Sequence, residues 1–332
     1  MSRVCVIGAG AAGLCAARHL IVDPSVSRVD VLEQAAQLGG TTNLPKEIMG
    51  FPDFPIPENE KSYLPSKDML AFLQMYSDKH GVTEHIKIFA DKRVLVIGAG
   101  PSGMDIALEV TSVAPKVVLS HHLQEKPKTI FPDNLVQRPD VVKLEGTTAF
   151  FQDGSEEDVD VVFLCTGYLY NFPFLHASCE IVVEDNCVEP LYKHMVNIHH
   201  PTMCFIGVPY YVCAFSMFDL QVRYYVRSMN GTFKLPTPDQ MVESWEEEKQ
   251  DRAARGYSKR QAHMMGPDQE KYYASLAAEA STENLPSVLT KIREESSIRF
   301  LHNLKHYRQD IYKIIDDDTY EVISNGKSEI LC

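Results

Sequence analysis

The sequence has no long hydrophobic run. Its longest apolar stretch, residues 204–216, is interrupted by Gly207 and Pro209 and is shorter than the ~20 residues that a membrane-spanning helix needs. A strand-like run, 4–7, begins almost at the first residue, which leaves no space before it for the charged and apolar regions of a secretory signal. We therefore expect no membrane span and a cytoplasmic location.

Basic residues and paired cysteines are also scarce. The chain has 32 Lys and Arg against 45 Asp and Glu, a formal net charge of −13, which argues against a nucleic-acid partner because phosphate backbones are bound by clustered basic side chains. None of the eight cysteines forms a C-x-x-C pair, so neither a zinc ribbon nor a dithiol redox centre is indicated, and we predict no metal. The 45% hydrophobic content is ordinary for a globular chain, and 332 residues suggest about two domains.

A repeat is the most informative feature that the sequence does contain. The segment 3–13 recurs at 93–103, where eight of the eleven residues are the same. In each copy a β-rich run leads into a G-x-G-x-x-G turn and then into a helix-forming stretch, 14–20 or 104–110. One such turn is a weak signal, but two copies in the same strand–turn–helix context predict two dinucleotide-binding units.

The three glycines of such a turn have separate tasks. The first makes the tight turn, the second lets the backbone approach a pyrophosphate, and the third lets the helix pack on the strand. The helix that follows presents free N–H groups and the positive end of its dipole to phosphates. The six positions are Gly8, Gly10, Gly13, Gly98, Gly100 and Gly103.

The end of the second strand in each unit indicates which dinucleotide is bound. In the first unit the strand ends in Glu33, and an acid there hydrogen-bonds an unphosphorylated ribose 2′-OH, as FAD or NAD requires. In the second unit it ends in Ser120, followed by His121 and His122. No carboxylate stands there to repel a 2′-phosphate, and two imidazoles could receive one, which favours NADP(H). The alternative is that both histidines are solvated surface residues.

A β-hairpin is predicted in the later part of the second unit, with strands at 148–152 and 159–165. The second of these strands leads into Thr166 and Gly167, where the missing Cβ of glycine permits close approach by a cofactor.

The last part of the chain is predicted to be mainly helical. A strand at 203–208 leads to a helix that begins near Gln221, and from about residue 236 we expect a charged helical layer.

Together these motifs resemble the flavin-containing monooxygenases, and among them the soluble insect N-oxygenase type. The matching pieces are the two glycine-rich turns, the loop 38–41, the segments 42–47 and 51–55, the run 165–168, the helix around Gln221 and the region 307–317.

The resemblance implies an α/β fold of two Rossmann-like dinucleotide domains, with the NADP domain inserted into the FAD domain, and a C-terminal helical layer. The implied boundaries are 1–90 for the first part of the FAD-binding domain, 91–168 for the NADP-binding domain, and 169–332 for the second part of the FAD-binding domain with the C-terminal helical region.

The sequence departs from the family pattern at two places. In the family a Gly-Gly-Thr loop is followed by Trp and a further flavin-contacting stretch, but here Thr41 leads directly into Thr42 and Asn43. Family members also carry a long segment, with an F-x-G-x-x-x-H motif, between the strand at 85–87 and the second glycine-rich unit. We therefore expect two internal segments to be missing, either as a truncation or as residues left out of the sequence.

The activity implied by the resemblance is that of an NADPH- and O2-dependent flavoprotein monooxygenase. It would oxygenate the nitrogen or sulfur of amines or sulfides through a flavin C4a-hydroperoxide, as an N,N-dialkylamine or alkaloid N-oxygenase does. The implied cofactors are FAD and NADP(H), and the implied partners are O2 and a small-molecule amine or sulfide; a homo-oligomer stays open. Two alternatives are an NADPH-dependent flavin reductase or oxidase that releases peroxide, and a truncated inactive variant.

The resemblance also assigns individual residues. Asn43 matches the family's catalytic asparagine; a turn-forming residue is the alternative reading. The residues assigned to FAD are Gly8, Ala9, Gly10, Ala11, Ala12, Gly13, Glu33, Gly40, Thr41, Thr42, Asn43 and Gln221. Those assigned to NADP(H) are Gly98, Gly100, Pro101, Ser102, Gly103, Met104, Asp105, Ser120 and His121, with Thr166 and Gly167 between the two cofactors.

Overall fold

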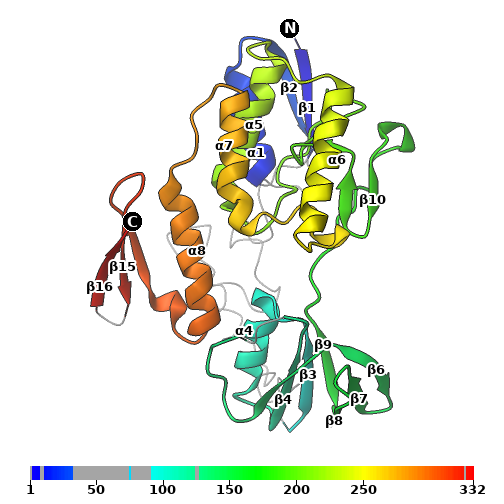
Figure 1. Ribbon diagram of the computed structural model, residues 1–332, viewed down its shortest axis with the longest axis vertical. Helices are drawn as coiled ribbons and strands as arrows, with labels where there is room; N and C mark the ends of the chain where they lie inside the picture. The colour runs from blue at the N-terminus through cyan, green and yellow to red at the C-terminus, as the bar shows by residue number, and fades with distance from the viewer. Residues whose placement is uncertain (1, 8–10, 33–74, 76–90, 124–126, 325–326) are drawn as a thin grey trace.

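The computed structural model describes residues 2–7, 11–32, 75, 91–123, 127–324 and 327–332, which form an upper and a lower body (Figure 1). The upper body begins with a β-α-β unit of three elements, β1 (Ser2–Ile7), α1 (Ala11–Val22) and β2 (Val26–Leu32). The two strands are parallel, with Val4 opposite Val29. This is the strand–turn–helix–strand order predicted from the first glycine-rich turn.

The lower body contains the second unit, and its central sheet is entirely parallel. The sheet elements and their helix are β3 (Arg93–Ile97), α4 (Pro101–Val110), β4 (Lys116–Ser120), β5 (Leu135–Arg138) and β9 (Val161–Leu164). The strand order is β5-β4-β3-β9. Val94, Leu95 and Val96 on β3 are fully buried, as expected for a strand covered on both faces. The prediction of a Rossmann-like unit here is confirmed.

The predicted hairpin is present, but its second strand was placed wrongly. A three-stranded antiparallel sheet is formed by β6 (Val141–Glu145), β7 (Thr148–Phe151) and β8 (Glu156–Asp158). The run from 159 was expected to pair with β7. Instead Val161–Leu164 pair with Val94–Ile97 of the fully parallel sheet, and the shorter run Glu156–Asp158 takes the place beside β7.

Between β9 and the helical part, the described chain forms only short antiparallel pairs. They are β10 (Val182–Glu184) with β11 (Cys187–Glu189), and β12 (Leu191–Tyr192) with β13 (Val196–Asn197), after the short helix η2 (Ala177–Cys179). The strand predicted at 203–208 is wrong, since only an isolated bridge joins Cys204 to Val196.

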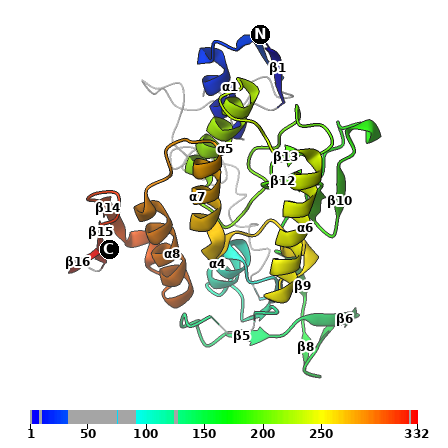
Figure 2. The ribbon, with the colours of Figure 1, turned by 45° about the horizontal axis from the view of Figure 1, so that its top comes forward.

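A helical layer completes the upper body (Figure 2), as predicted. Its members are α5 (Ala214–Met229), α6 (Pro238–Ala254), the short helices η3 (Lys259–Gln261) and η4 (Gly266–Asp268), and α7 (Gln269–Glu279). The next helix, α8 (Ser287–His302), runs from this layer toward the lower body, where its Phe300 packs (Figure 1). α5 packs on α1, where Val222 and Val226 meet Leu20. Helices that precede and follow the lower body in the sequence therefore share one core, as the predicted insertion of one domain into the other requires.

The chain ends in a small antiparallel sheet that was not predicted. After η5 (Tyr307–Gln309) it consists of β14 (Ile311–Ile314), β15 (Tyr320–Ser324) and β16 (Lys327–Leu331). Tyr320 and Val322 on β15 are buried against Val288 of α8, so the sheet is held by the helix before it.

The segment after α8 also contacts the lower body. Leu304 is buried in the same core as Val94 and Val96 of β3. Its backbone N–H donates to Thr129 Oγ1 at 3.1 Å, and the Thr129 N–H donates to the Leu301 carbonyl at 2.8 Å. The C-terminal part of the chain therefore contributes to the core of the second nucleotide unit.

Two buried histidines link three separate segments of the upper body. The Val188 N–H donates to His263 Nε2 at 2.9 Å, so this nitrogen carries no proton. The two Nδ1 atoms of His263 and His194 lie 2.9 Å apart, and His194 Nε2 lies 2.8 Å from Glu248 Oε1. A single proton arrangement satisfies all three contacts, in which His263 donates to His194 and His194 donates to the Glu248 carboxylate, which Arg252 also binds.

Candidate dinucleotide site

The candidate site lies at the carboxyl end of β3. The chain runs from β3 through α4 to the neighbouring strand β4, while β9 lies on the other side of β3. Open parallel sheets bind ligands at such a point, where the connections on the two sides of a strand diverge. The glycine-rich turn 98–103 stands at this point.

Gly98 and Gly103 are required by the packing of the protein itself. Gly98 has a φ of +105°, and a Cβ there would lie 2.4 Å from the Cys165 carbonyl oxygen. A Cβ on Gly103 would lie 1.7 Å from the Gly98 carbonyl oxygen. No larger residue fits at either position without moving backbone, which agrees with the tight-turn and close-packing tasks expected of them.

Gly100 differs from the other two glycines. A Cβ on it would meet no atom of the described residues within 4 Å, so the surrounding protein gives no reason for a glycine. Gly100 is also the N-cap of α4. The first turn of this helix holds no acidic residue, and no described side chain caps its N-terminus by a hydrogen bond. Free N–H groups and the positive end of the helix dipole therefore point past Gly100, an arrangement that suits a bound phosphate.

The remaining predicted residues of α4 divide into exposed and buried ones. Pro101 and Ser102 are exposed at the start of the helix. The Met104 side chain is fully buried in the core and its N–H bonds the Gly100 carbonyl, so the assignment of Met104 to a cofactor is not supported. The Asp105 carboxylate forms a two-point ion pair with Arg308, at 2.9 and 2.5 Å.

The predicted 2′-phosphate residues are already bonded within the protein. Ser120 is buried, and its hydroxyl donates to the Pro139 carbonyl at 2.8 Å. His121 is also buried; its Nδ1 accepts from the Leu123 N–H, and its Nε2 lies 3.0 Å from Gln137 Oε1. Both side chains are therefore engaged away from a ligand. His122, by contrast, is exposed, so the alternative of two surface histidines holds for His122 but not for buried His121.

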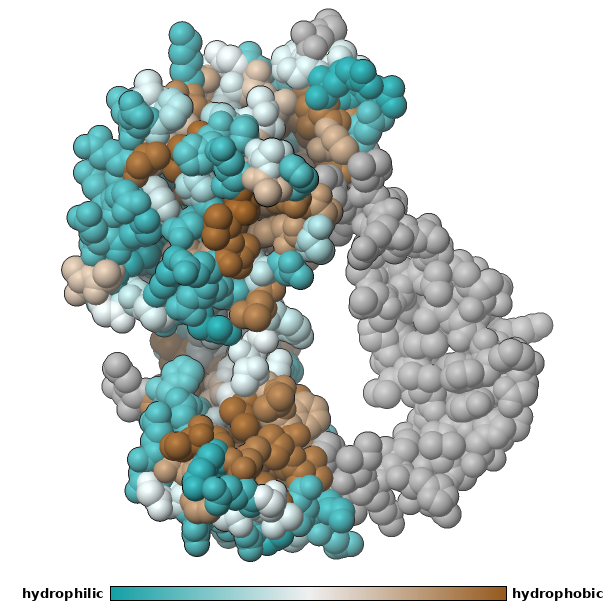
Figure 3. Space-filling view, turned by 90° about the vertical axis from the view of Figure 1, so that its right-hand side faces the viewer, coloured by the Kyte–Doolittle hydropathy of each residue, from teal (hydrophilic) through white to brown (hydrophobic). Residues whose placement is uncertain are grey.

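Thr166 and Gly167 lie beside the turn; their predicted position between two cofactors stays a prediction. Cys165 N–H bonds the Ile97 carbonyl at 2.8 Å, which brings the end of β9 against the end of β3. Thr166 and Gly167 follow and are exposed, and Gly167 has a φ of +82°. Apolar side chains gather on the face of the lower body shown in Figure 3. At the end of β9, Leu164 is an exposed apolar side chain. Apolar surroundings with few polar groups are typical of ligand sites.

Gln221 does not lie where the sequence placed it. It is in the middle of α5 (Ala214–Met229), not at the start of the helix, and its side chain is fully buried. Its Oε1 accepts from the Gly207 N–H at 2.9 Å, and its Nε2 donates to the Tyr272 hydroxyl at 2.7 Å. Gln221 therefore joins a loop to α7, with both atoms of its buried amide bonded within the protein.

Most of the predicted FAD residues lie outside the described residues. Ala12 and Gly13 are in the first turns of α1, which has no acidic residue in its first turn, and Ala11 begins the helix. The predicted residues outside the described ranges are Gly8, Ala9, Gly10, Glu33, Gly40, Thr41, Thr42 and Asn43. The two junctions where segments were expected to be missing also lie outside them.

Arg308 is the residue near this site that sequence reasoning missed. It is held over the ring of Tyr307, 4.7 Å from the ring centre, and reaches Asp105 on the first turns of α4. The two residues are 203 positions apart, and no local pattern signals such a pairing.

The matches to known protein families agree with a dinucleotide site of this geometry. The chain matches the flavin-binding monooxygenase-like family over residues 83–125 and 122–296. It belongs to that family. Residues 6–52 also match an NAD(P)-binding Rossmann-like domain. Flavin-binding family membership and the two dinucleotide units support FAD and NADP(H) as the cofactors, as predicted.

Similar curated proteins include one from Tyria jacobaeae and one from Arabidopsis thaliana. Senecionine N-oxygenase of Tyria jacobaeae is 34% identical over 249 residues, which cover 73% of this chain and 54% of that protein; the chain thus spans about half the length of this relative. A flavin-containing monooxygenase of Arabidopsis thaliana, FMO GS-OX5, is 28% identical, with 81% of this chain and 83% of that protein covered.

The second alignment bears on the missing segments. It extends over 382 positions but uses 81% of the 332 residues, or about 269, so about 113 positions of the alignment have no residue in this chain. This shortfall of about 113 positions agrees with the expectation that this chain lacks internal segments of the family.

Two solved structures have the same fold. S-allyl-L-cysteine S-oxygenase from Allium sativum has a TM-score of 0.71 at 23% identity, with 92% of this chain and 94% of that chain covered. Tmm from Pelagibacter sp. strain HTCC7211 has a TM-score of 0.65 at 19% identity, with 99% and 96% covered. At these identities the likeness concerns the fold. Within the described ranges, no helix is both long and apolar enough to cross a membrane; the cytoplasmic location stays a prediction.

Proposed function

We propose that this chain is an NADPH- and O2-dependent flavoprotein monooxygenase that transfers one oxygen atom to a soft nucleophile, the nitrogen of an amine or the sulfur of a sulfide. Membership of the family supports the class of reaction. The relatives are named as an N-oxygenase and an S-oxygenase, and amine nitrogen and thioether sulfur share the exposed lone pair that accepts an electrophilic oxygen. The cytoplasmic location and the residue roles below belong to the same proposal.

One observation carries the nucleotide part of this proposal, namely the open space at Gly100. The fold explains Gly98 and Gly103, but no described atom comes within 4 Å of a Cβ at Gly100. A glycine there makes sense if a ligand approaches the backbone closely. In the proposal the N–H groups at the start of α4 bind the NADP(H) pyrophosphate, and Thr166 and Gly167 lie between the nicotinamide and the flavin.

FAD, when bound, accepts hydride from NADPH and activates O2. The protein's own part is to bind and orient the cofactors. Gly8, Gly10 and Gly13 would receive the FAD pyrophosphate and Glu33 its ribose, while Asn43 would donate a hydrogen bond beside the flavin. These roles rest on the resemblance to the family and on the order of elements β1, α1 and β2.

Two glycine variants test the nucleotide site. Gly100→Ala should fold like the wild type and keep FAD, but its affinity for NADP(H) should fall about tenfold or more, since a hydrogen bond to a charged phosphate contributes about 1.5–3 kcal/mol and each 1.4 kcal/mol is a factor of about ten. Gly103→Ala is the matched control, because its Cβ overlaps the Gly98 carbonyl; it should lose stability as well as nucleotide affinity. Flavin absorbance, NADPH-driven flavin reduction and thermal unfolding separate these effects. Equal loss of FAD and NADP(H) from Gly100→Ala would refute the assigned roles.

A second function, an NADPH-dependent reductase or oxidase that releases peroxide, is favoured by the positions missing relative to the Arabidopsis protein. The ratio of oxygenated product to hydrogen peroxide decides between the two. Turnover of NADPH with a tertiary amine or a thioether should give N-oxide or sulfoxide in proportion to NADPH consumed. Peroxide in that proportion, without oxygenated product, would favour the oxidase.

A further inference from the structure

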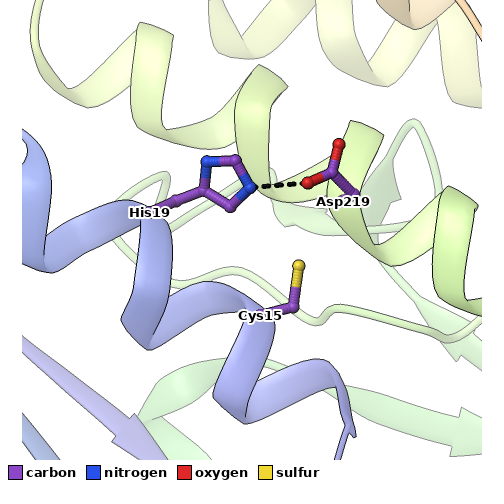
Figure 4. A group of neighbouring side chains, drawn as sticks. All are labelled: Cys15, His19 and Asp219. Atoms are coloured by element: carbon purple, nitrogen blue, oxygen red, sulfur yellow. Dashed lines mark hydrogen bonds and ion pairs between the residues drawn. The ribbon is translucent and has the colours of Figure 1, made fainter.

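The contact between α1 and α5 holds a group of side chains that the nucleotide sites do not use. Cys15 and His19 project from α1, and Asp219 projects toward them from α5 (Figure 4). The two helices are held together by an apolar contact in which Leu20 packs against Val222. The three polar side chains therefore lie on a fixed interface, not on mobile surface segments.

The spacing of the three residues brings their polar atoms together. Cys15 and His19 are four positions apart on one helix and so lie on the same face, one turn from each other. His19 Nε2 lies 2.6 Å from Asp219 Oδ1. One ligand atom from each of the three residues, the thiol sulfur, an imidazole nitrogen and a carboxylate oxygen, lies within 4.8 Å of the other two.

The surroundings fix the carboxylate and leave one of its oxygens for the group. Arg223 Nε donates to Asp219 Oδ2 at 2.8 Å, so Oδ1 is the oxygen turned toward His19. Burial alone would raise the pKa of Asp219, but the hydrogen bonds from His19 and Arg223 outweigh it and lower the pKa. The side chains of His19 and Asp219 are 20% and 34% exposed, so water and a small ion can reach them.

We propose that Cys15, His19 and Asp219 form a binding site for a divalent zinc ion, with the fourth position open to water. Thiolate, imidazole and carboxylate are the three ligand types of protein zinc sites, at about 2.3, 2.0–2.1 and 2.0–2.2 Å from the metal. Tetrahedral geometry at those distances separates ligand atoms by about 3.3–3.6 Å. The present separations differ from these by an ångström or so, which side-chain rotation on two fixed helices can supply.

The charges of this site balance when zinc binds. Cys15 holds its thiol proton without a metal, because burial and the nearby Asp219 carboxylate raise its pKa. On binding, the sulfur–hydrogen bond breaks, the proton leaves to solvent, and the sulfur–zinc bond forms. The His19 Nε2–H bond to Asp219 is given up as the imidazole proton moves to Nδ1, so that Nε2 of the neutral ring and Asp219 Oδ1 both bind the ion. The thiolate and the carboxylate together carry two negative charges against the two positive charges of the ion. Zinc would thereby join α1, the helix after the first glycine-rich turn, to α5.

Cobalt titration of the full chain tests the proposal, because Co²⁺ replaces Zn²⁺ and has visible spectra. With the thiols kept reduced and no flavin or nucleotide added, one equivalent of Co²⁺ should give a thiolate-to-cobalt charge-transfer band and intense tetrahedral d–d bands. One equivalent of Zn²⁺ should abolish both. Cys15→Ser should remove the charge-transfer band and weaken Zn²⁺ binding at least tenfold to a hundredfold, the range already seen when supporting residues of a metal site are lost. Cys5→Ser, at an exposed cysteine of β1, should leave the band unchanged.

Three results would overturn the site. They are a wild-type spectrum without the thiolate band, a band that survives in Cys15→Ser, and unchanged Zn²⁺ affinity in Asp219→Asn. A surviving band or an unchanged Zn²⁺ affinity would show adventitious metal binding elsewhere on the protein. A wild-type spectrum without the thiolate band would leave His19 and Asp219 as a simple ion pair between helices. If circular dichroism shows that Cys15→Ser is unfolded, His19→Gln gives the same test. Because neither cofactor is present, failure here is distinct from failure of the proposed oxygenase activity.

Discussion

The buried pair His194 and His263 predicts a loss of stability in mild acid. Burial, with smaller contributions from His194, lowers the pKa of His263 from 6.5 to about 3. The folded chain therefore keeps His263 neutral, since a proton on Nε2 would face the Val188 N–H. In the unfolded chain the imidazole takes up a proton near pH 6.5, so acid favours unfolding from that pH downward.

The size of the effect follows from the two pKa values of His263. Each pH unit between them is worth about 1.4 kcal/mol, so by pH 5 the free energy of unfolding should have fallen by about 2 kcal/mol relative to pH 8. Protonation of Glu248 does not add to this fall in the free energy of unfolding above pH 4.5. Burial tends to raise its pKa, but His194 and Arg252 lower it to about 2, so its contribution is lost only below the pKa of an ordinary glutamate.

The assay uses the chain's single tryptophan. Trp245 stacks on the His263 ring, with ring centres 5.9 Å apart and an angle of 13° between the rings, so its fluorescence reports this part of the upper body. Urea unfolding at pH 8, 7, 6 and 5 should show the decline in the wild type. His263→Gln keeps an acceptor for Val188 but cannot titrate; it should be less stable at pH 8 and lose about 2 kcal/mol less on going to pH 5.

His122→Gln is the matched control, because His122 is 85% exposed. It should retain the pH dependence of the wild type. A constant difference in unfolding free energy between wild type and His263→Gln from pH 8 to pH 5 would refute the reasoning, because it would show that His263 titrates alike in both states.

Three further changes have clear expected results. Gln221→Leu should lower the free energy of unfolding by about 2 kcal/mol, because the Gly207 N–H loses its acceptor and the Tyr272 hydroxyl keeps only its bond to the Lys193 carbonyl; a loss under 1 kcal/mol in urea unfolding would contradict this role. Leu304→Ala should cost about 2–5 kcal/mol, whereas Leu301→Ala, at a 39% exposed side chain, should cost far less, and similar losses would argue against the core contact of Leu304. Among the thiols, Cys187 should react last with a disulfide reagent, since it is the buried cysteine and burial raises its pKa, and exposed Cys332 among the first; mass spectrometry of partly labelled protein gives the order.

The sequence was most informative where local rules act alone. In the turn 98–103, Gly98 and Gly103 are required by backbone space, so its strand and helix could be predicted from the pattern of residues. The prediction of a strand at 203–208 failed because an apolar run also suits a buried irregular segment. There the Phe205 N–H bonds the Met195 carbonyl outside any sheet. Hydrophobicity alone does not separate these cases.

The start of the helix around Gln221 was misplaced for a related reason. Cys213, the N-cap of α5, provides no side-chain hydrogen bond to the helix within the described structure, so the usual signal of a helix start is missing. The C-terminal sheet did leave a trace, because buried Tyr320 and Val322 alternate with more exposed neighbours. Likewise, the four-residue spacing of Cys15 and His19 was visible, but not their partner on α5, which only the fold supplies.

The position of Leu304 has a consequence for the order of events during synthesis. The strands and helix of the lower body have all emerged by residue 164, yet a side chain of their core arrives about 140 residues later. Until then the growing chain carries a nucleotide unit with an uncovered apolar surface. A fragment that ends near residue 168 would keep that surface exposed. The second nucleotide unit therefore resembles a separate domain in the sequence, but its core is complete only when Leu304 packs against it.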